Sequence, residues 1–101
     1  MTARLKARGN GHFAIDGELS FATVPSLWEE SKRSFANSPD AIAINFAAAG
    51  HTDSAGLALL VAWTRWAHDA AKSIRFTNAP KQITALAEAN KLTHVLPLQA
   101  A

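Results

Sequence analysis

The chain has 101 residues, of which 49% are apolar and 18% are charged, and its formal net charge is only +2. These values exclude a disordered chain, argue against a nucleic-acid-binding surface, and predict that residues 1–101 form a single domain with its own core. The sequence contains no cysteine, which excludes disulfides, thiolate metal sites and a thiol nucleophile.

The first 17 residues predict a β-hairpin. Residues 2–8 alternate between apolar and basic side chains, a pattern typical of a half-buried strand. Gly9-Asn10-Gly11 tolerates positive φ and therefore predicts the turn. Residues 12–17 continue as the second strand, so the basic side chains of the first strand are expected to face water.

Helices and strands alternate in the rest of the chain. A first helix is expected to begin at Ser20 or Thr23 and to run to about Ala36. After it we expect a strand, a helix, a strand, a helix and a short last strand, over 41–46, 54–71, 73–77, 80–90 and 95–98. The order ββαβαβαβ predicts an α/β fold in which a mixed β-sheet is covered by helices.

No segment has the pattern of a targeting or membrane-spanning sequence. Residues 1–12 are polar and basic, without the apolar stretch of a signal peptide. The longest apolar run, residues 55–63, is too short to cross a bilayer. We therefore expect a soluble, cytoplasmic protein without direct membrane insertion.

The stretch from Gly50 to Gly56 is the strongest candidate for a functional site. Asp53 and Ser54 are typical helix-capping residues, and an apolar run follows them. The small residues at 55 and 56 would let another backbone or side chain approach the start of that helix. A polar loop that leads into a helix N-terminus is suited to a partner or an anion.

Catalysis is a weaker interpretation of the same stretch. His51, Asp53 and Ser54 are the residue types of a hydrolytic triad, but neighbours on one loop rarely point at a common centre. The Gly-x-Ser-x-Gly elbow and a Gly-rich phosphate loop are both absent, and the histidines lack metal-ligand spacing. We therefore expect no enzyme activity, cofactor or metal.

The three tryptophans are a further signal in so short a chain. The core is the first interpretation for Trp28, Trp63 and Trp66, but tryptophan also anchors protein interfaces. Trp66 lies beside Leu59 at the shoulder of its helix. Our hypothesis is that Leu59 and Trp66 flank a partner surface beginning at the 50–56 loop, and complete burial of Trp66 would contradict it.

Two segments together resemble the STAS domain (sulfate transporter and anti-sigma factor antagonist). They are the strand Ile42–Phe46 and, after a loop of six, Asp53-Ser54-Ala55-Gly56-Leu57, which is similar to the family's Asp-Ser-Ser-Gly-Leu. Within the family the chain most resembles the MlaB group, the small STAS subunits of bacterial Mla lipid-transport ABC complexes. The similar segments are Gly17-Glu18-Leu19, Leu27-Trp28-Glu29 and the longer motif Asp53–Leu60.

This resemblance implies a STAS fold and a non-catalytic role. The chain would bind the MlaF-like ATPase subunit of an ABC transporter, in a complex with an inner-membrane permease that maintains outer-membrane lipid asymmetry. It would then lie in the cytoplasm, peripheral to the inner membrane. Together with the expected anchors, the partner-binding residues would be His51, Thr52, Asp53, Ser54, Ala55, Gly56, Leu59 and Trp66.

The alternative within the family is a partner-switching regulator of the anti-sigma factor antagonist type. In such proteins the regulatory phosphate is carried by the second serine of Asp-Ser-Ser-Gly-Leu, a position that is Ala55 here. Ser54 is then the candidate phosphoacceptor. Asn45 replaces the family's usual aspartate at the strand end, and Thr52 takes a position that is normally apolar. The missing hydroxyl at Ala55 favours the transporter subunit, and the departures at Asn45 and Thr52 weaken any claim about phosphate or nucleotide handling.

Overall fold

A computed structural model of the chain describes residues 3–99 and contains a five-stranded sheet and three helices. In chain order these are β1 (Ala3–Gly9), β2 (His12–Leu19), α1 (Val24–Ala36), β3 (Ala41–Thr52), α2 (Ser54–Asp69), β4 (Ser73–Thr77), α3 (Lys81–Ala89) and β5 (Leu98–Gln99). The predicted order ββαβαβαβ and the α/β class are confirmed. Within residues 3–99, no helix has the length and apolar character needed to cross a membrane.

The strands lie in the sheet in the order in which they occur in the chain. β1 and β2 form an antiparallel hairpin, and each later strand pairs parallel with the one before it. The hairpin turn Gly9-Asn10-Gly11 has positive φ at all three residues, which explains its composition. A Cβ at Gly11 would also collide with the carbonyl oxygen of Ala41, so the turn packs directly on the start of β3.

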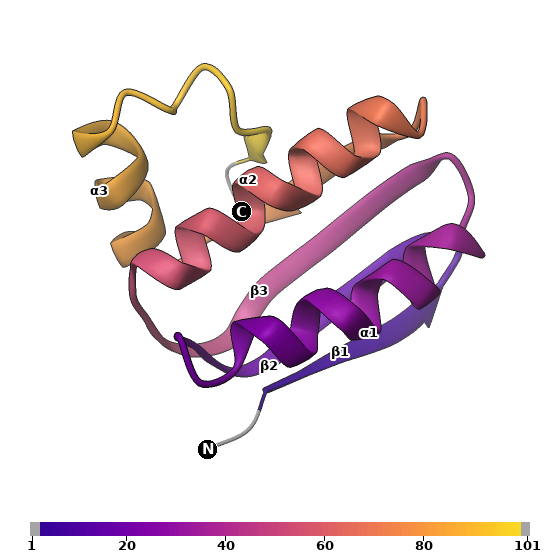
Figure 1. The fold of residues 1–101 in the computed structure, drawn as a ribbon, viewed down its shortest axis with the longest axis horizontal. Helices are drawn as coiled ribbons and strands as arrows, with labels where there is room; N and C mark the ends of the chain where they lie inside the picture. The colour runs from indigo at the N-terminus through magenta and orange to yellow at the C-terminus, as the bar shows by residue number, and fades with distance from the viewer. Residues whose placement is uncertain (1–2, 100–101) are drawn as a thin grey trace.

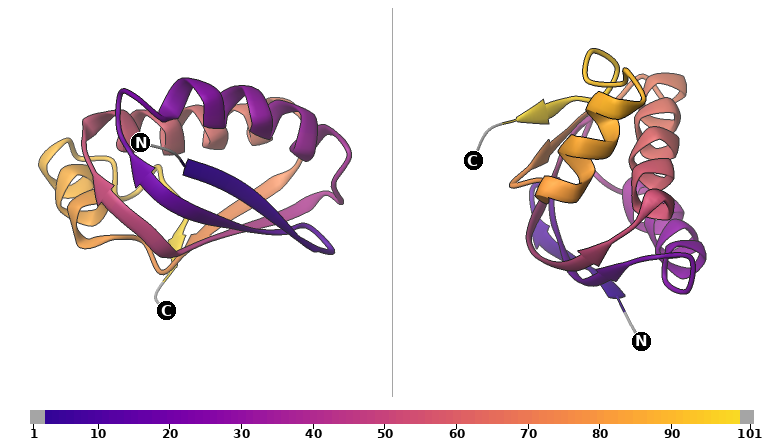
Figure 2. Two further views of the ribbon diagram at one scale, coloured as in Figure 1. Left: turned by 90° about the horizontal axis from the view of Figure 1, so that it is seen from below. Right: turned by 90° about the vertical axis from the view of Figure 1, so that its left-hand side faces the viewer.

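The helices cover one face of the sheet. Figure 2 shows α1 and α2 over this face, and the opposite face carries no helix within the described residues. In Figure 1, α1 and α2 run side by side, and α3 lies near the start of α2. The strand side chains alternate accordingly: Ile42, Ile44 and Phe46 are buried under the helices, whereas Asn45 is exposed on the opposite side.

Trp63 of α2 lies at the centre of the core. It is fully buried, and its ring centroid is 5.6 Å from that of Phe35, 6.5 Å from Phe46 and 6.3 Å from Phe76. The indole N–H donates a 2.8 Å hydrogen bond to the hydroxyl oxygen of Ser31 on α1. The one polar atom of the indole is therefore satisfied, and the ring joins α1, α2, β3 and β4.

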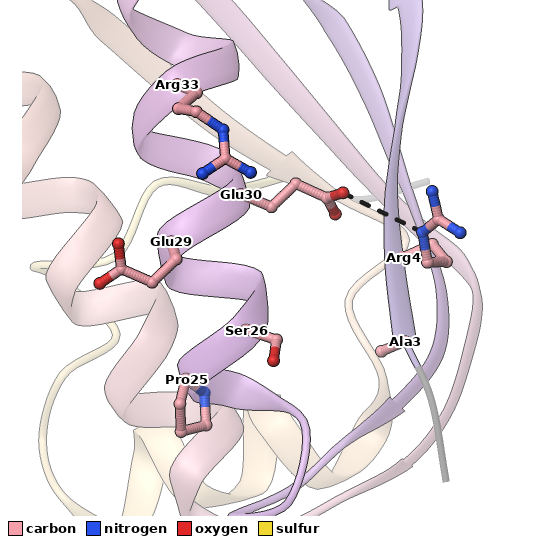
Figure 3. A pocket seen from close by; sticks show the side chains of 7 residues that line it. All are labelled: Ala3, Arg4, Pro25, Ser26, Glu29, Glu30 and Arg33. Atoms are coloured by element: carbon pink, nitrogen blue, oxygen red, sulfur yellow. Dashed lines mark ion pairs between the residues drawn. The ribbon is translucent and has the colours of Figure 1, made fainter.

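The exposed edge of the sheet, strand β1, is held against α1. The backbone N–H of Leu5 donates to Glu30 Oε1 at 3.0 Å, and Arg4 Nε lies 4.0 Å from Glu30 Oε2. Figure 3 shows this ion pair across a hollow of about 540 Å³ between β1 and α1. Since an edge strand with free N–H groups invites pairing with another chain, this contact protects the edge. The polar side chains Arg4 and Glu30 that line the hollow thus serve to hold β1 against α1.

Several boundaries differ from the sequence prediction, and three of the differences have a clear physical reason. β3 continues to Thr52 instead of ending at 46, because its second half pairs with the end of β2 through two register shifts. α2 ends at Asp69, two residues early, because Ala71 has a positive φ of 57°. The last strand is Leu98–Gln99, because the N–H groups at 95 and 96 both donate to the carbonyl of Leu92 in a turn.

Candidate partner-binding site

The start of α2 is fixed by a side-chain cap and by a backbone hydrogen bond to the end of β2. Asp53 is the N-cap residue: its backbone is extended, and its Oδ1 accepts a 2.8 Å hydrogen bond from the N–H of Ala55. The N–H of Asp53 donates to the carbonyl of Leu19 at 3.0 Å, which ties the helix start to the end of β2. The loop expected before this helix is in fact the end of β3, so the site is presented by a strand and not by a flexible loop.

Asp53 and Ser54 therefore make different contributions to stability. Asp53→Ala is expected to lower the free energy of unfolding by about 1 kcal/mol, because it removes the side-chain cap. Ser54→Ala is expected to change it by less than about 0.5 kcal/mol, because Ser54 is exposed at the first helical position. Urea unfolding followed by circular dichroism measures both. Equal losses would show that the serine hydroxyl shares the capping.

The small residues of the motif serve packing within the chain. A Cβ at Gly56 would lie 2.7 Å from Thr52 Cγ2 and 3.1 Å from Leu19 Cβ. The close approach expected at this glycine is therefore made by side chains of the chain's own β2 and β3. Thr52 is 3% exposed and Ala55 is 7% exposed, so both support the site from beneath.

The accessible part of the motif is short. His51 and Ser54 are exposed and Asp53 is half-buried, so these are the motif residues available to a partner. Among residues 3–99, no hydrogen bond joins the side chains of His51, Asp53 and Ser54, and no group of three acidic or histidine side chains is placed to hold a metal. The motif thus exposes a helix N-terminus with polar side chains beside it.

Phe21 is an exposed aromatic residue that the sequence analysis missed. Its side chain is 75% exposed, although it lies in the short connection between β2 and α1. Phe21 lies two residues after Leu19. Leu19 pairs with Thr52, and its carbonyl oxygen accepts a hydrogen bond from the N–H of Asp53. The signal available in the sequence was a large aromatic between Ser20 and Thr23, the two candidate starts of the first predicted helix. We call Phe21, Gly50, His51, Asp53 and Ser54 the docking surface.

The two expected anchors on α2 have different outcomes. Leu59 is 2% exposed and belongs to the core, so its placement on a partner surface was wrong. The reason is that α2 packs against the sheet and also contacts α1 and α3, which buries a wider arc than a single stripe. Trp66 is half-buried, with its ring centroid 5.6 Å from that of Phe35.

Trp66 retains an accessible side. With Trp28 and Val61 it lines a shallow groove of about 470 Å³ between α1 and α2. Complete burial, the result that would have contradicted a role for Trp66 in binding, is not observed. Its contact with a partner stays a prediction.

A comparison with protein-family models covers nearly the whole sequence. A family model described as MlaB, STAS domain, matches residues 3–98. The chain belongs to the MlaB-like STAS family. No curated protein sequence matches it. The motif Asp53–Leu57 of this STAS domain thus lies where β3 ends and α2 begins, with the second hydroxyl position occupied by the buried Ala55.

Solved structures confirm the STAS fold. The unphosphorylated anti-sigma factor antagonist SpoIIAA has a TM-score of 0.75 at 19% identity, covering 98% of this chain and 87% of that one. An anti-sigma factor antagonist from Mycobacterium paratuberculosis has a TM-score of 0.75 at 20% identity, covering 95% and 84%. Phosphorylated SpoIIAA from Bacillus has a TM-score of 0.72 at 20% identity, covering 98% and 90%.

Proposed function

We propose that this STAS domain, formed by residues 1–101, is the MlaB-type subunit of a lipid-transport ABC complex and binds its MlaF-like ATPase subunit. The match to the MlaB-type family over residues 3–98 carries the proposal. In this role the chain lies in the cytoplasm, peripheral to an inner-membrane permease, and supports outer-membrane lipid asymmetry. Its contribution is non-catalytic.

The docking surface supports this role physically. An exposed phenylalanine beside a helix N-terminus offers an apolar anchor next to the N–H groups and partial positive charge of the first helical turn. The Asp53 N–H bond to Leu19 holds the start of α2, and the N–H groups of Thr23 and Val24 donate to the carbonyl of Ser20 and close the turn that carries Phe21. Little ordering is therefore required on binding. By contacting one arrangement of the ATPase better than another, such a rigid surface stabilises that arrangement.

The second candidate is partner switching of the anti-sigma factor antagonist type. It is favoured by the exposure of Ser54, because a phosphate at a helix N-terminus is electrostatically stabilised. It is opposed by Ala55, which has no hydroxyl at the position expected to carry the phosphate. Incubation with the serine kinases of the host, followed by intact-mass measurement, distinguishes the two: phosphate transfer to Ser54 would favour this candidate over the transporter subunit.

The transporter proposal is tested by co-purification with the ATPase of the host's Mla-type complex. We expect the wild-type chain to co-purify and Phe21→Ser to bind about tenfold more weakly, because truncating an exposed aromatic anchor removes apolar contact area. The control is Val95→Ser, which truncates another large exposed apolar side chain, one that lies between α3 and β5. No binding by the folded wild type would refute the proposal, and equal weakening in both variants would move the anchor away from Phe21.

A further inference from the structure

The helix-free face of the sheet contains a concavity with a small-residue floor. It has a volume of about 480 Å³ and is lined by Arg8, His12, Phe13, Ala14, Ala43, Asn45, Arg75 and Thr77. His12 pairs with Ala43, which pairs with Arg75, so these three residues form one row across β2, β3 and β4. Ala14, Asn45 and Thr77 form the next row. Ala43 is only 6% exposed although no helix covers it, and it does not belong to the core cluster.

The first row is cationic. His12 and Arg75 lie two strands apart, about 10 Å between Cα atoms, so long side chains from both reach over Ala43. Arg8 approaches from the end of β1, where the register shifts. Among residues 3–99, neither Arg8 nor Arg75 forms an ion pair, and no carboxylate lines the concavity.

The other basic residues of β1 are already paired. Lys6 Nζ lies 3.0 Å from Asp16 Oδ2, and Arg4 lies near Glu30. Unpaired positive charge therefore concentrates at the concavity and does not extend evenly along the face. Two arginine side chains line the concavity, and the guanidinium group of each can donate two parallel hydrogen bonds to a phosphate.

The second row offers uncharged polar groups. Asn45 Oδ1 accepts from the Ala47 N–H at 2.8 Å and from Asn78 Nδ2 at 3.0 Å, which fixes the orientation of the amide. Its Nδ2 donates no hydrogen bond within the described residues and is left as a donor. Thr77 adds a hydroxyl beside it, about 7 Å along the strands from the cationic row.

We propose that this concavity binds a small organic phosphate, with the phosphate between Arg8 and Arg75 and a neutral hydroxylated part against Asn45 and Thr77. The volume is in the range of small-molecule sites, about 300–1,000 Å³, and exceeds the size of a free phosphate ion. Ala43, Asn45, Arg75 and Thr77 alternate with the strand residues buried under the helices, so the site lies on the face opposite α2 and apart from the docking surface.

The test is a titration of the full-length, ¹⁵N-labelled protein with glycerol 3-phosphate, observed by NMR. We expect saturable shifts of the amides of His12, Ala43 and Arg75, with a dissociation constant on the order of millimolar. Glycerol alone is expected to cause none. Arg75→Gln should weaken binding about tenfold or more, because it removes a charged fork from the phosphate. Arg8→Gln, in an exposed position where folding is not at risk, should weaken it several-fold.

The matched control is Lys6→Gln, which removes the same charge from the same face outside the concavity. It should change the affinity less than about twofold, because that lysine is already paired with Asp16. Loss of binding in Lys6→Gln equal to that in Arg75→Gln would overturn the site in favour of diffuse charge. Inorganic phosphate binding as tightly as glycerol 3-phosphate would overturn the organic ligand. An absence of saturable shifts, or binding only to phosphatidylglycerol vesicles, would overturn the proposal as a whole.

Discussion

Replacement of Trp63 by alanine is expected to lower the free energy of unfolding by about 3–5 kcal/mol, because a fully buried indole is removed and a cavity is left. The ring contacts Phe35, Phe46 and Phe76 from three other elements, so the surrounding core cannot collapse without moving them. Its N–H bond to Ser31 is lost as well. The measurement is urea unfolding of wild type and variant, followed by far-ultraviolet circular dichroism.

Trp66→Ala is the matched control for this change. Trp66 lies three residues later on the same helix, but it is half-buried and packs on Phe35 from the groove side. Less apolar area leaves water on folding, so the loss of stability should be clearly smaller than for Trp63. An equal loss in the two variants would contradict the placement of Trp63 at the centre of the core.

Ser54→Glu is expected to weaken binding to the Mla-type ATPase about a hundredfold, equivalent to about 3 kcal/mol. The docking surface requires close approach to the helix start, and a long charged side chain there obstructs the partner. Stability should be unchanged or slightly higher, by up to about 1 kcal/mol, because a carboxylate in the first turn interacts favourably with the helix dipole. Isothermal titration calorimetry gives the affinity, and urea unfolding gives the stability.

Ser26→Glu provides the control for charge and size. Ser26 is also an exposed serine in the first turn of a helix, α1, but it faces the hollow beside β1. The affinity of this variant for the ATPase should match that of the wild type. If Ser54→Glu binds normally, Ser54 lies outside the interface. If both variants lose binding, the effect is one of net charge.

The side-chain pattern was sufficient for the order of elements and insufficient for several of their boundaries. The mostly apolar run Ala41–Phe46 predicted the first half of β3, as a strand covered on both faces. Coverage of both faces was wrong, because Asn45 is exposed on the side of the sheet opposite α1 and α2. The second half of β3, Ala47–Thr52, has small and polar residues without alternation. It is a strand because its backbone pairs with β2, and such pairing leaves no trace in the side-chain pattern.

The position of the motif at the start of a helix could be predicted from the sequence, but the burial and the neighbours of its residues could not. Asp53 was recognisable as a cap because capping depends on local chemistry. The burial of Leu59 was not, because it depends on neighbours from α1 and α3 that the sequence of one helix does not reveal. Phe21 was missed for a related reason: its proximity to Asp53 follows from the pairing of β2 with β3.

The most direct test of the central claim is to add unlabelled ATPase to the ¹⁵N-labelled STAS domain and to record which amides broaden or shift. The ATPase-subunit proposal predicts that the changes centre on residues 20–22 and 50–54, with none at His12, Ala43 and Arg75 on the helix-free face. Changes centred on the helix-free face, or an unchanged spectrum at saturating ATPase, would contradict the docking surface and the proposed partner.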